Sequence, residues 1–309
     1  MTLSAAAMAG APALVRAETM TTVRVMGIPN DDCTSLMYAL KNGLFRKAGL
    51  DIQFEKGVSG ATVAAAVVGN QADIGKSSMS SIFDAHEKGI PFGLLAPAAI
   101  YESKAPYAVF LYNKDVTIRS GKDLAGAVAS LSSLSSLGRS AMLQWLDRNG
   151  GDPKNIKFVE VPMSQAAAAT AQKRVVVAEI AYPALAAAMA TGNFKVLPVY
   201  DTIAPRYVFS SWFTTKDWST KNPAAAHAFA RVIAAAATYT NAHKPETAAM
   251  MAEFTGMELS VISQMSRVTD GTVLTPASIQ PVIDTYAKYQ SLKPPFPAAE
   301  IIDPHALTR

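Results

Sequence analysis

The sequence has 309 residues, and at about 150 residues per domain this length predicts two domains. Hydrophobic residues make up 50% of the chain and charged residues 17%, which supplies apolar material for two packed cores and argues against disorder. The net charge of +4 is small, and no run of lysine and arginine is interleaved with aromatic residues. The composition therefore argues against a nucleic-acid partner.

The first 17 residues have features of a targeting segment. The apolar run at residues 3–14 is too short to span a bilayer, and the small residue Ala17 stands where a signal peptidase would cleave. We therefore expect a signal-peptide remnant over residues 1–17, cleaved after Ala17. No basic stretch precedes the apolar run, so the alternative is an alanine-rich tail without a targeting role. Cys33 is the only cysteine, which rules out an internal disulfide.

The pattern over residues 23–108 predicts alternating strands and helices. Leu36, Met37 and Leu40 recur at helical spacing, and Gly43 stands where a helix would end in a left-handed residue. The connections are short, which implies a parallel sheet whose loops gather at the carboxyl ends of the strands, where open α/β sheets bind ligands. The elements expected here are strands at 23–26, 50–54, 73–75 and 92–96, a helix that follows the loop at 27–32 and ends at Gly43, and helices at 59–70 and 78–88.

Residues 109–208 repeat this pattern as a second α/β unit. The chain is expected to enter it through the β run at 107–112 and to leave it through the β run at 206–213, and everything after Lys216 is expected to be helical. The predicted fold class is α/β with two lobes, residues 18–108 with 209–309 and residues 109–208. Two crossing strands that join two such lobes describe a hinge.

Five stretches carry a resemblance to a known family. They are YALKNGLFRKAGLDIQF at 38–54, GNQADIG at 69–75, KGIPFGLLAP at 88–97, IRSGKDLAGAVAS at 118–130 and GDPKNIKFVEVP at 151–162. In this order and at these distances they resemble the periplasmic solute-binding proteins of the nitrate/sulfonate/taurine (NitT/TauT) group. The resemblance implies the type II periplasmic-binding-protein fold, which the thiamine-pyrimidine synthases share.

The resemblance also implies a function. It suggests an exported, periplasmic and monomeric protein that captures a small solute, a sulfonate, aromatic acid or pyrimidine-like molecule, and delivers it to an ABC permease in the inner membrane. One alternative is an enzyme of the thiamine-pyrimidine synthase or deaminase type, but the cysteine-rich iron motif of the synthase is missing here. Another is a sensor domain, which would need an appended DNA-binding or membrane-spanning segment, and none is found in the sequence.

Catalytic motifs are missing from the sequence. The four histidines are isolated, and there is no HExxH, GxSxG, phosphate-loop or GxGxxG pattern. We therefore expect no cofactor, no metal and no catalytic residue.

Candidate binding residues follow the predicted strands. The loop at 27–32 offers backbone N–H groups and two carboxylates, and helices that begin near residues 59 and 77 direct their amides toward the cleft. The serine run at 130–136 precedes another helix, with an ordinary flexible loop as the alternative interpretation. The predicted ligand-binding residues are Asn30, Asp31, Asp32, Ser59, Gly60, Ala61, Ser77, Ser78, Ser132, Ser133, Ser135, Ser136, Tyr182 and Tyr207.

Tyr182 is the main departure from the family pattern. The resemblance places a glutamate of a Glu-Pro pair at this position, whereas this chain has Tyr182 before Pro183. A phenol ring favours stacking and one hydrogen bond over an ion pair, so we expect Tyr182 to project into the cleft. Glu179 is either a displaced acid or a strand residue at the lobe surface, and Trp212 either reaches the cleft or belongs to the core. Together the candidates suggest a ring that bears a donor at one end and an oxygen-rich group at the other.

Overall fold

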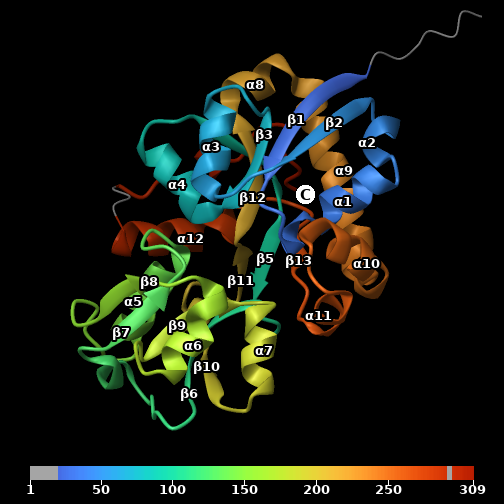
Figure 1. Cartoon of the computed structure of the whole chain (residues 1–309). Coiled ribbons are helices and arrows are strands. Elements are labelled where there is room, and N and C mark those ends of the chain that lie inside the picture. The colour runs from blue at the N-terminus through green and yellow to red at the C-terminus, as the bar shows by residue number, and fades with distance from the viewer. Residues whose placement is uncertain (1–19, 291–293) are drawn as a thin grey trace, which may run out of the picture.

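The protein folds into two lobes, each built around a five-stranded mixed sheet (Figure 1). The structure is a computed structural model that describes residues 20–290 and 294–309. The targeting segment expected over residues 1–17 lies outside this range. The α/β class and the two lobes expected from the sequence are confirmed.

The first sheet has the strand order β2-β1-β3-β12-β4. β1 pairs in parallel with β2 and β3, so that Val25 lies opposite Phe54 on one side and Ile74 on the other. β12 joins from the distant part of the chain and is antiparallel to β3 and β4. The strands are β1 (Thr21–Gly27), β2 (Leu50–Lys56), β3 (Ile74–Ser78), β4 (Phe92–Pro97) and β12 (Ser210–Thr215).

Helices from both ends of the chain cover the first sheet (Figure 1). Local signals set several of their ends: Ser59 and Ser78 cap α3 and α4 with their hydroxyl groups, and Gly43 takes a left-handed φ of 63° between α1 and α2. The helices are α1 (Thr34–Lys41), α2 (Leu44–Lys47), α3 (Gly60–Val68), α4 (Met79–Glu87), α8 (Lys216–Lys221), α9 (Pro223–Ala242), α10 (Lys244–Thr255), α11 (Leu259–Gln264) and α12 (Pro276–Tyr289).

The second sheet has the strand order β10-β6-β9-β7-β8. Its parallel pairs are β7 with β8 and β7 with β9, whereas β6 runs antiparallel between β9 and β10. The strands are β6 (Ala108–Asn113), β7 (Val128–Leu131), β8 (Lys157–Glu160), β9 (Val177–Ala181) and β10 (Phe194–Leu197). The helices of this lobe are α5 (Leu137–Arg148), α6 (Ala166–Ala171) and α7 (Ala184–Ala190).

A third, three-stranded sheet runs between the lobes, and we call it the hinge sheet. It consists of β11 (Arg206–Val208), β5 (Ala99–Glu102) and β13 (Thr269–Asp270) in that order. The first crossing expected at 107–112 is therefore wrong, because β6 is an inner strand of the second sheet and β5 makes the crossing. The return through β11 and β12 is confirmed. The strand β13 also interrupts the region after Lys216 that was expected to be wholly helical.

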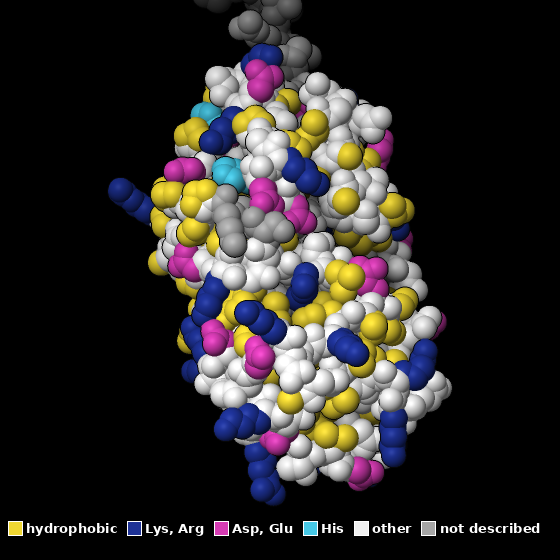
Figure 2. All heavy atoms as spheres, turned by 90° about the vertical axis from the view of Figure 1, so that its left-hand side faces the viewer, with side chains coloured by type: hydrophobic (Ala, Val, Ile, Leu, Met, Phe, Trp, Pro, Cys, Tyr) yellow, Lys and Arg dark blue, Asp and Glu magenta, His cyan; other side chains and the backbone are white. Residues whose placement is uncertain are grey.

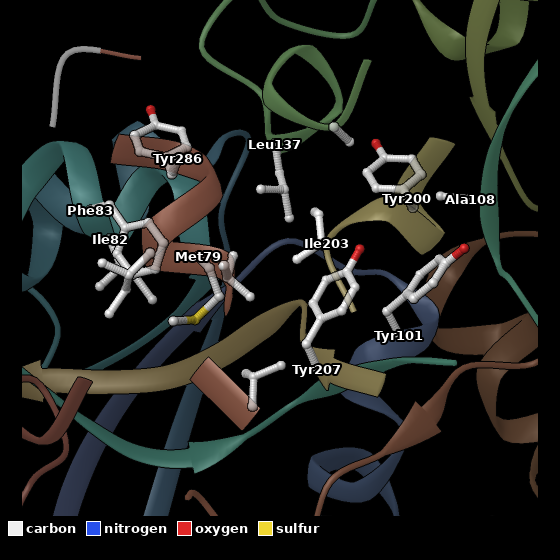
Figure 3. Close-up of a cluster of buried hydrophobic side chains, with 14 of the residues drawn as sticks. Met79, Ile82, Phe83, Tyr101, Ala108, Leu137, Tyr200, Ile203, Tyr207 and Tyr286 are labelled. Atoms are coloured by element: carbon white, nitrogen blue, oxygen red, sulfur yellow. The ribbon is translucent and has the colours of Figure 1, made fainter. Parts of the chain in front are cut away.

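The hydrophobic core is continuous from one lobe to the other. It runs from Phe83 on α4 through Tyr286 on α12 and the hinge-sheet residue Tyr207 to Tyr200 in the second lobe (Figure 3). The rings of Phe83 and Tyr286 have centroids 5.6 Å apart. Helix α12 thus packs against α4, β11 and α5, and it braces both lobes.

Tyr207 lies inside this core and not on the cleft surface where the sequence analysis placed it. Its side chain is fully buried, and its ring stacks on Tyr101 with centroids 4.9 Å apart. Its hydroxyl has no hydrogen-bond partner among the residues described. Tyr207 is a packing residue of the hinge sheet.

We predict that Tyr207→Phe leaves the free energy of unfolding unchanged or raises it by about 1 kcal/mol. The variant keeps the contacts of the ring and loses a buried hydroxyl that has no partner. Burying such a hydroxyl costs about 1–3 kcal/mol of desolvation, and the variant avoids this cost. Denaturant unfolding monitored by circular dichroism measures this change. A loss of stability above about 1 kcal/mol would show that the hydroxyl makes a favourable contact.

Asp270 is a buried carboxyl group on β13, 3% exposed. Its Oδ2 accepts a hydrogen bond from Thr240 at 3.1 Å, and its Oδ1 has no partner among the described residues. Burial, followed by the charge of Asp31, raises the pKa of Asp270 to about 8, while the Thr240 bond and Arg267 act in the opposite direction. The folded protein therefore holds a proton on Asp270 that the unfolded chain releases at much lower pH.

We predict that Asp270→Asn becomes increasingly stabilising, relative to the unmodified protein, as the pH rises from about 4 to about 8. The pKa of Asp270 is about 8 in the folded protein and about 4 in the unfolded chain, so its contribution to stability is fully present below about pH 4. This contribution decreases as the pH rises from about 4 and is lost at about pH 8. The neutral amide does not titrate. Thermal unfolding of both proteins across this range measures the difference, and a difference that is constant with pH would contradict the prediction.

Candidate functional site

The loops that follow β1 and β9 face each other across the space between the lobes. They enclose a cavity of about 310 Å³, which we call the cleft cavity. Its walls also include the segments before β6 and β12 and the segment around α11. The lining residues are Pro29, Asn30, Asp31, Asp32, Tyr107, Met163, Ala181, Tyr182, Pro183, Phe209, Met257, Met265, Ser266 and Val268.

The two neighbouring carboxylates of the cleft cavity are both held by internal ion pairs. Asp32 accepts hydrogen bonds from Lys76 Nζ and, at 2.7 Å, from Ser210 Oγ. Asp31 accepts from Arg267 Nε at 2.5 Å and from the backbone N–H of Val268 at 2.7 Å. The sequence placed both aspartates in the cleft, but it gave no sign of the two cations that bind them.

Lys76 and Cys33 lie behind Asp32 and are buried. Burial by itself lowers the pKa of Lys76, but the charge of Asp32 and its other contacts outweigh this, so the pKa is raised and the lysine stays charged. Burial raises the pKa of the Cys33 thiol to about 11. Neither group has the character of an activated nucleophile, because a reactive thiol needs a lowered pKa and a nucleophilic lysine must be neutral.

Three aromatic rings, those of Tyr107, Tyr182 and Phe209, line the cleft cavity. Tyr107 and Phe209 meet edge to face with centroids 5.0 Å apart, and the backbone N–H of Tyr182 donates to the carbonyl of Tyr107 at 3.1 Å. Tyr182 is half-buried and packs against the cores of both lobes. The structure therefore brings Tyr182 together with Asn30, Asp31 and Asp32 in one cavity.

Several residues that line the cleft cavity were not predicted from the sequence. Met257, Met265, Ser266 and Val268 come from the segment around α11, which the sequence analysis treated only as helix. Figure 1 shows α11 reaching from the first lobe toward α7 of the second. Two methionines flanking a short helix were the available signal, since methionine is frequent at adaptable binding surfaces.

Other predicted residues line a second space between the lobes, of about 620 Å³, which we call the serine cavity. Ser59, Gly60 and Ala61 lie at the start of α3, and Ser133 and Ser135 face them from the serine run. The Ser59 hydroxyl accepts from the backbone N–H of Thr62 at 3.1 Å, so it is engaged as a cap. Figure 2 looks onto the α4 and α12 side of the molecule, where the waist between the lobes exposes hydrophobic side chains among basic ones. The predicted residues that line a cavity are thus divided: these five line the serine cavity, whereas Asn30 to Asp32 and Tyr182 line the cleft cavity.

The remaining predicted serines have structural partners or are buried. Ser78 caps α4, and Ser77 is 2% exposed. Ser136 precedes α5, and its hydroxyl has no partner among the described residues. None of these three lines the cleft cavity or the serine cavity.

Glu179 holds the serine run in place. Its carboxylate accepts from the backbone N–H and the hydroxyl of Ser132, at 2.7 and 2.8 Å, and from the hydroxyl of Tyr200. It approaches the start of α5 at Gly138, where any Cβ atom would collide with Glu179 Oε1. Ser132 is thus tied to Glu179, and Glu179 is neither at the lobe surface nor among the residues that line the two cavities.

The described residues include neither a metal-binding cluster nor a membrane-spanning helix. No group of three or more His, Cys, Asp or Glu side chains within residues 20–290 and 294–309 could hold a metal ion. No helix in these ranges combines the length and apolar character that a membrane span requires. Trp212 is fully buried in the first lobe against Phe229, so it belongs to the core.

Comparison with solved structures shows the fold. The periplasmic aliphatic sulphonate binding protein SsuA from Escherichia coli superposes with a TM-score of 0.75 at 18% identity, covering 91% of each chain. The alkanesulfonate-binding protein SsuA from Xanthomonas axonopodis pv. citri, bound to MOPS, gives 0.70 at 16% identity, covering 91% of this chain and 97% of that one. The periplasmic nitrate-binding protein NrtA from Synechocystis PCC 6803 gives 0.69 at 14% identity, covering 93% and 86%.

The sequence was also compared with curated proteins and with family models. No curated protein gave a significant match. The model described as NMT1/THI5 like matches residues 30–248, which is more than half of the chain and includes the loop after β1, the whole second lobe and the hinge strands β5 and β11. The chain belongs to the NMT1/THI5-like family.

Proposed function

We propose that the protein is the extracytoplasmic solute-binding component of an ABC importer. The family and the fold support this, because the solved structures that share the fold include sulfonate- and nitrate-binding proteins. The observation that carries the proposal is the cleft cavity, whose walls come from both lobes. A small molecule held there contacts both lobes at once, and it can therefore stabilise their closed arrangement.

The cleft cavity has the size and lining of a small-molecule site. Its volume of about 310 Å³ lies at the lower end of the range of about 300–1,000 Å³ for such pockets. Apolar and aromatic side chains dominate the lining, and a few polar groups, such as Asn30 and Ser266, can orient a ligand. We therefore propose this cavity as the ligand site, with Tyr182 as its aromatic anchor.

The proposal includes the partners and the location expected from the sequence. The protein is monomeric, is exported to the periplasm after cleavage behind Ala17, and delivers its ligand to an ABC permease in the inner membrane. Its lobes are residues 18–108 with 209–309 and residues 109–208, and they close about β5 and β11. It releases its ligand unchanged, since Cys33 is a buried thiol with a raised pKa and Lys76 is held in an ion pair.

The direct test is to identify the solute that co-purifies with the protein. Native mass spectrometry, followed by a thermal-shift panel of solutes, should reveal a bound small molecule that raises the melting temperature. The solute recovered after incubation should be chemically unchanged. Recovery of a chemically altered product would show that the protein is an enzyme and contradict the proposed binding function.

We predict that Tyr182→Ala weakens solute binding by about 1–3 kcal/mol, the scale of a lost aromatic anchor with its hydrogen bond. The melting temperature of the solute-free protein should change little, because the side chain is only half-buried. Calorimetry measures the affinity. Tyr38→Ala is the matched control, a half-buried tyrosine on α1 that lines neither cavity. Intact affinity with a lowered melting temperature would make Tyr182 a structural residue.

We also predict that the solute reduces the radius of gyration. Closure about the hinge sheet brings the lobes together, and small-angle scattering at saturating solute measures the change. The Tyr182→Ala variant binds the solute more weakly, so the same solute concentration does not saturate it. Its radius of gyration should therefore decrease less than that of the unmodified protein. An unchanged scattering profile for the unmodified protein at saturation would argue against closure.

A further inference from the structure

The residues that line the cleft cavity include two carboxylates and no basic side chain, because the cations that pair with these carboxylates lie behind the lining. Asp31 and Asp32 are its only ionisable residues apart from two tyrosines, and it includes no lysine, arginine or histidine. Its neutral donors are the side chains of Asn30, Ser266 and the tyrosines. A bound anion would therefore meet neutral donors and two carboxylates, with no cation to pair with.

The cations that bind these carboxylates are turned toward the protein. The side chains of Lys76 and Arg267 are 2% and 7% exposed. Lys76 Nζ also donates to the carbonyl of Ile28 at 3.1 Å. The two terminal nitrogens of Arg267 donate to Thr34 Oγ1 at 3.0 Å and to the carbonyl of Lys244 at 3.3 Å. Both cations are thus buried and bonded within the protein, and neither is among the residues that line the cleft cavity.

Two further acidic groups bear on the cavity: Asp270 is close enough to feel the charges of Asp31 and Asp32, and Glu179 acts on Tyr107. Glu179 and Asp270 are each 3% exposed. Tyr107, which lines the cavity, responds to this field: its pKa is raised, first by burial and then by the charges of Asp32, Glu179 and Asp31. The acidic groups around the cavity therefore disfavour a negative charge on Tyr107.

The remaining lining suits a soft, polarisable or aromatic body. The rings of Tyr107, Tyr182 and Phe209 stand on one side, and Met163, Met257 and Met265 complete the wall. Aromatic faces attract organic cations through their quadrupole, most strongly where water is excluded, and thioethers make favourable contacts with aromatic rings.

We propose that the cleft cavity takes an organic cation, a positively charged nitrogen group carried on an aromatic or aliphatic body. This inference rests on the proposed function and gives the charge of the ligand. It also separates this chain from the structural neighbours whose names specify sulfonate and nitrate, since those ligands are anions. The charged group lies toward Asp31 and Asp32, and the body lies against Tyr182 and Phe209.

The test uses two pairs of probes that match in shape and differ in charge. Benzamidine is paired with benzoate, and phenyltrimethylammonium with benzenesulfonate. Isothermal titration calorimetry at pH 7 and low salt should show each cation binding at least about tenfold more tightly than its anion, since screening is weakest under these conditions. Equal or tighter binding of the anions would overturn the inference and leave the solute-binding function standing.

The variant Asp31→Asn tests whether the bound cation lies beside Asp31. It removes one carboxylate and leaves the Arg267 charge unbalanced, so the preference for the cation should shrink about tenfold or reverse. Asp73→Asn is the matched control, because Asp73 also pairs with an arginine, Arg24, and has the same 11% side-chain exposure, but it lines neither cavity. An unchanged preference in Asp31→Asn would place the bound cation elsewhere and overturn the inference.

The comparison of probes on the unmodified protein stands even if Asp31→Asn does not fold. If none of the four probes binds, the charge of the co-purified solute at pH 7 decides, and an anionic solute overturns the inference. If nothing co-purifies either, the proposed function fails and the inference fails with it. The two failures are thus distinguishable.

Discussion

The contact on which the arrangement of the cleft depends is the buried ion pair between Asp32 and Lys76. Asp32 belongs to the loop after β1, Lys76 to β3, and Ser210, which donates to the other carboxylate oxygen, to β12. Three segments far apart in the chain are thereby fixed at one point. Removing one partner of such a pair leaves an uncompensated buried charge, at a cost of about 3–5 kcal/mol, so the three segments are held together strongly.

Buried hydrogen bonds also connect the hinge sheet to the serine run. Tyr101 on β5 donates to Asp201 at 2.7 Å, and the neighbouring Tyr200 donates to Glu179, which holds Ser132. A hydrogen-bonded path therefore joins a crossing strand to the serine run of the second lobe. The ring of Tyr207 stacks on Tyr101, and its hydroxyl has no hydrogen-bond partner among the described residues. A buried, aromatic hinge of this kind favours discrete arrangements of the lobes over continuous deformation, because packed cores resist intermediate states.

Much of the local structure could be predicted from the sequence. The starts of α3 at Ser59 and α4 at Ser78 follow from serine caps, and the break at Gly43 follows from its left-handed conformation, because each depends on a few adjacent residues. Tyr182 was placed at the cleft because it ends a strand and precedes a proline, and it does line the cleft cavity. The first crossing was placed too late, because a buried apolar run at 107–112 has the same pattern in a crossing strand as in an inner strand.

The sequence by itself determined the α/β class, the two lobes, the family resemblance and the loops that carry Asn30 to Asp32 and Tyr182, because short-range signals encode all of these. Only the tertiary structure decided which groups meet. Arg267 reaches Asp31 across 236 positions of sequence, and nothing in the loop at 27–32 predicted this pairing. For the same reason Tyr207 is inside the core, and the predicted serines that line a cavity lie in the serine cavity, apart from Asp31, Asp32 and Tyr182. Such contacts depend on how distant strands and helices pack, and no local pattern in the chain encodes that packing.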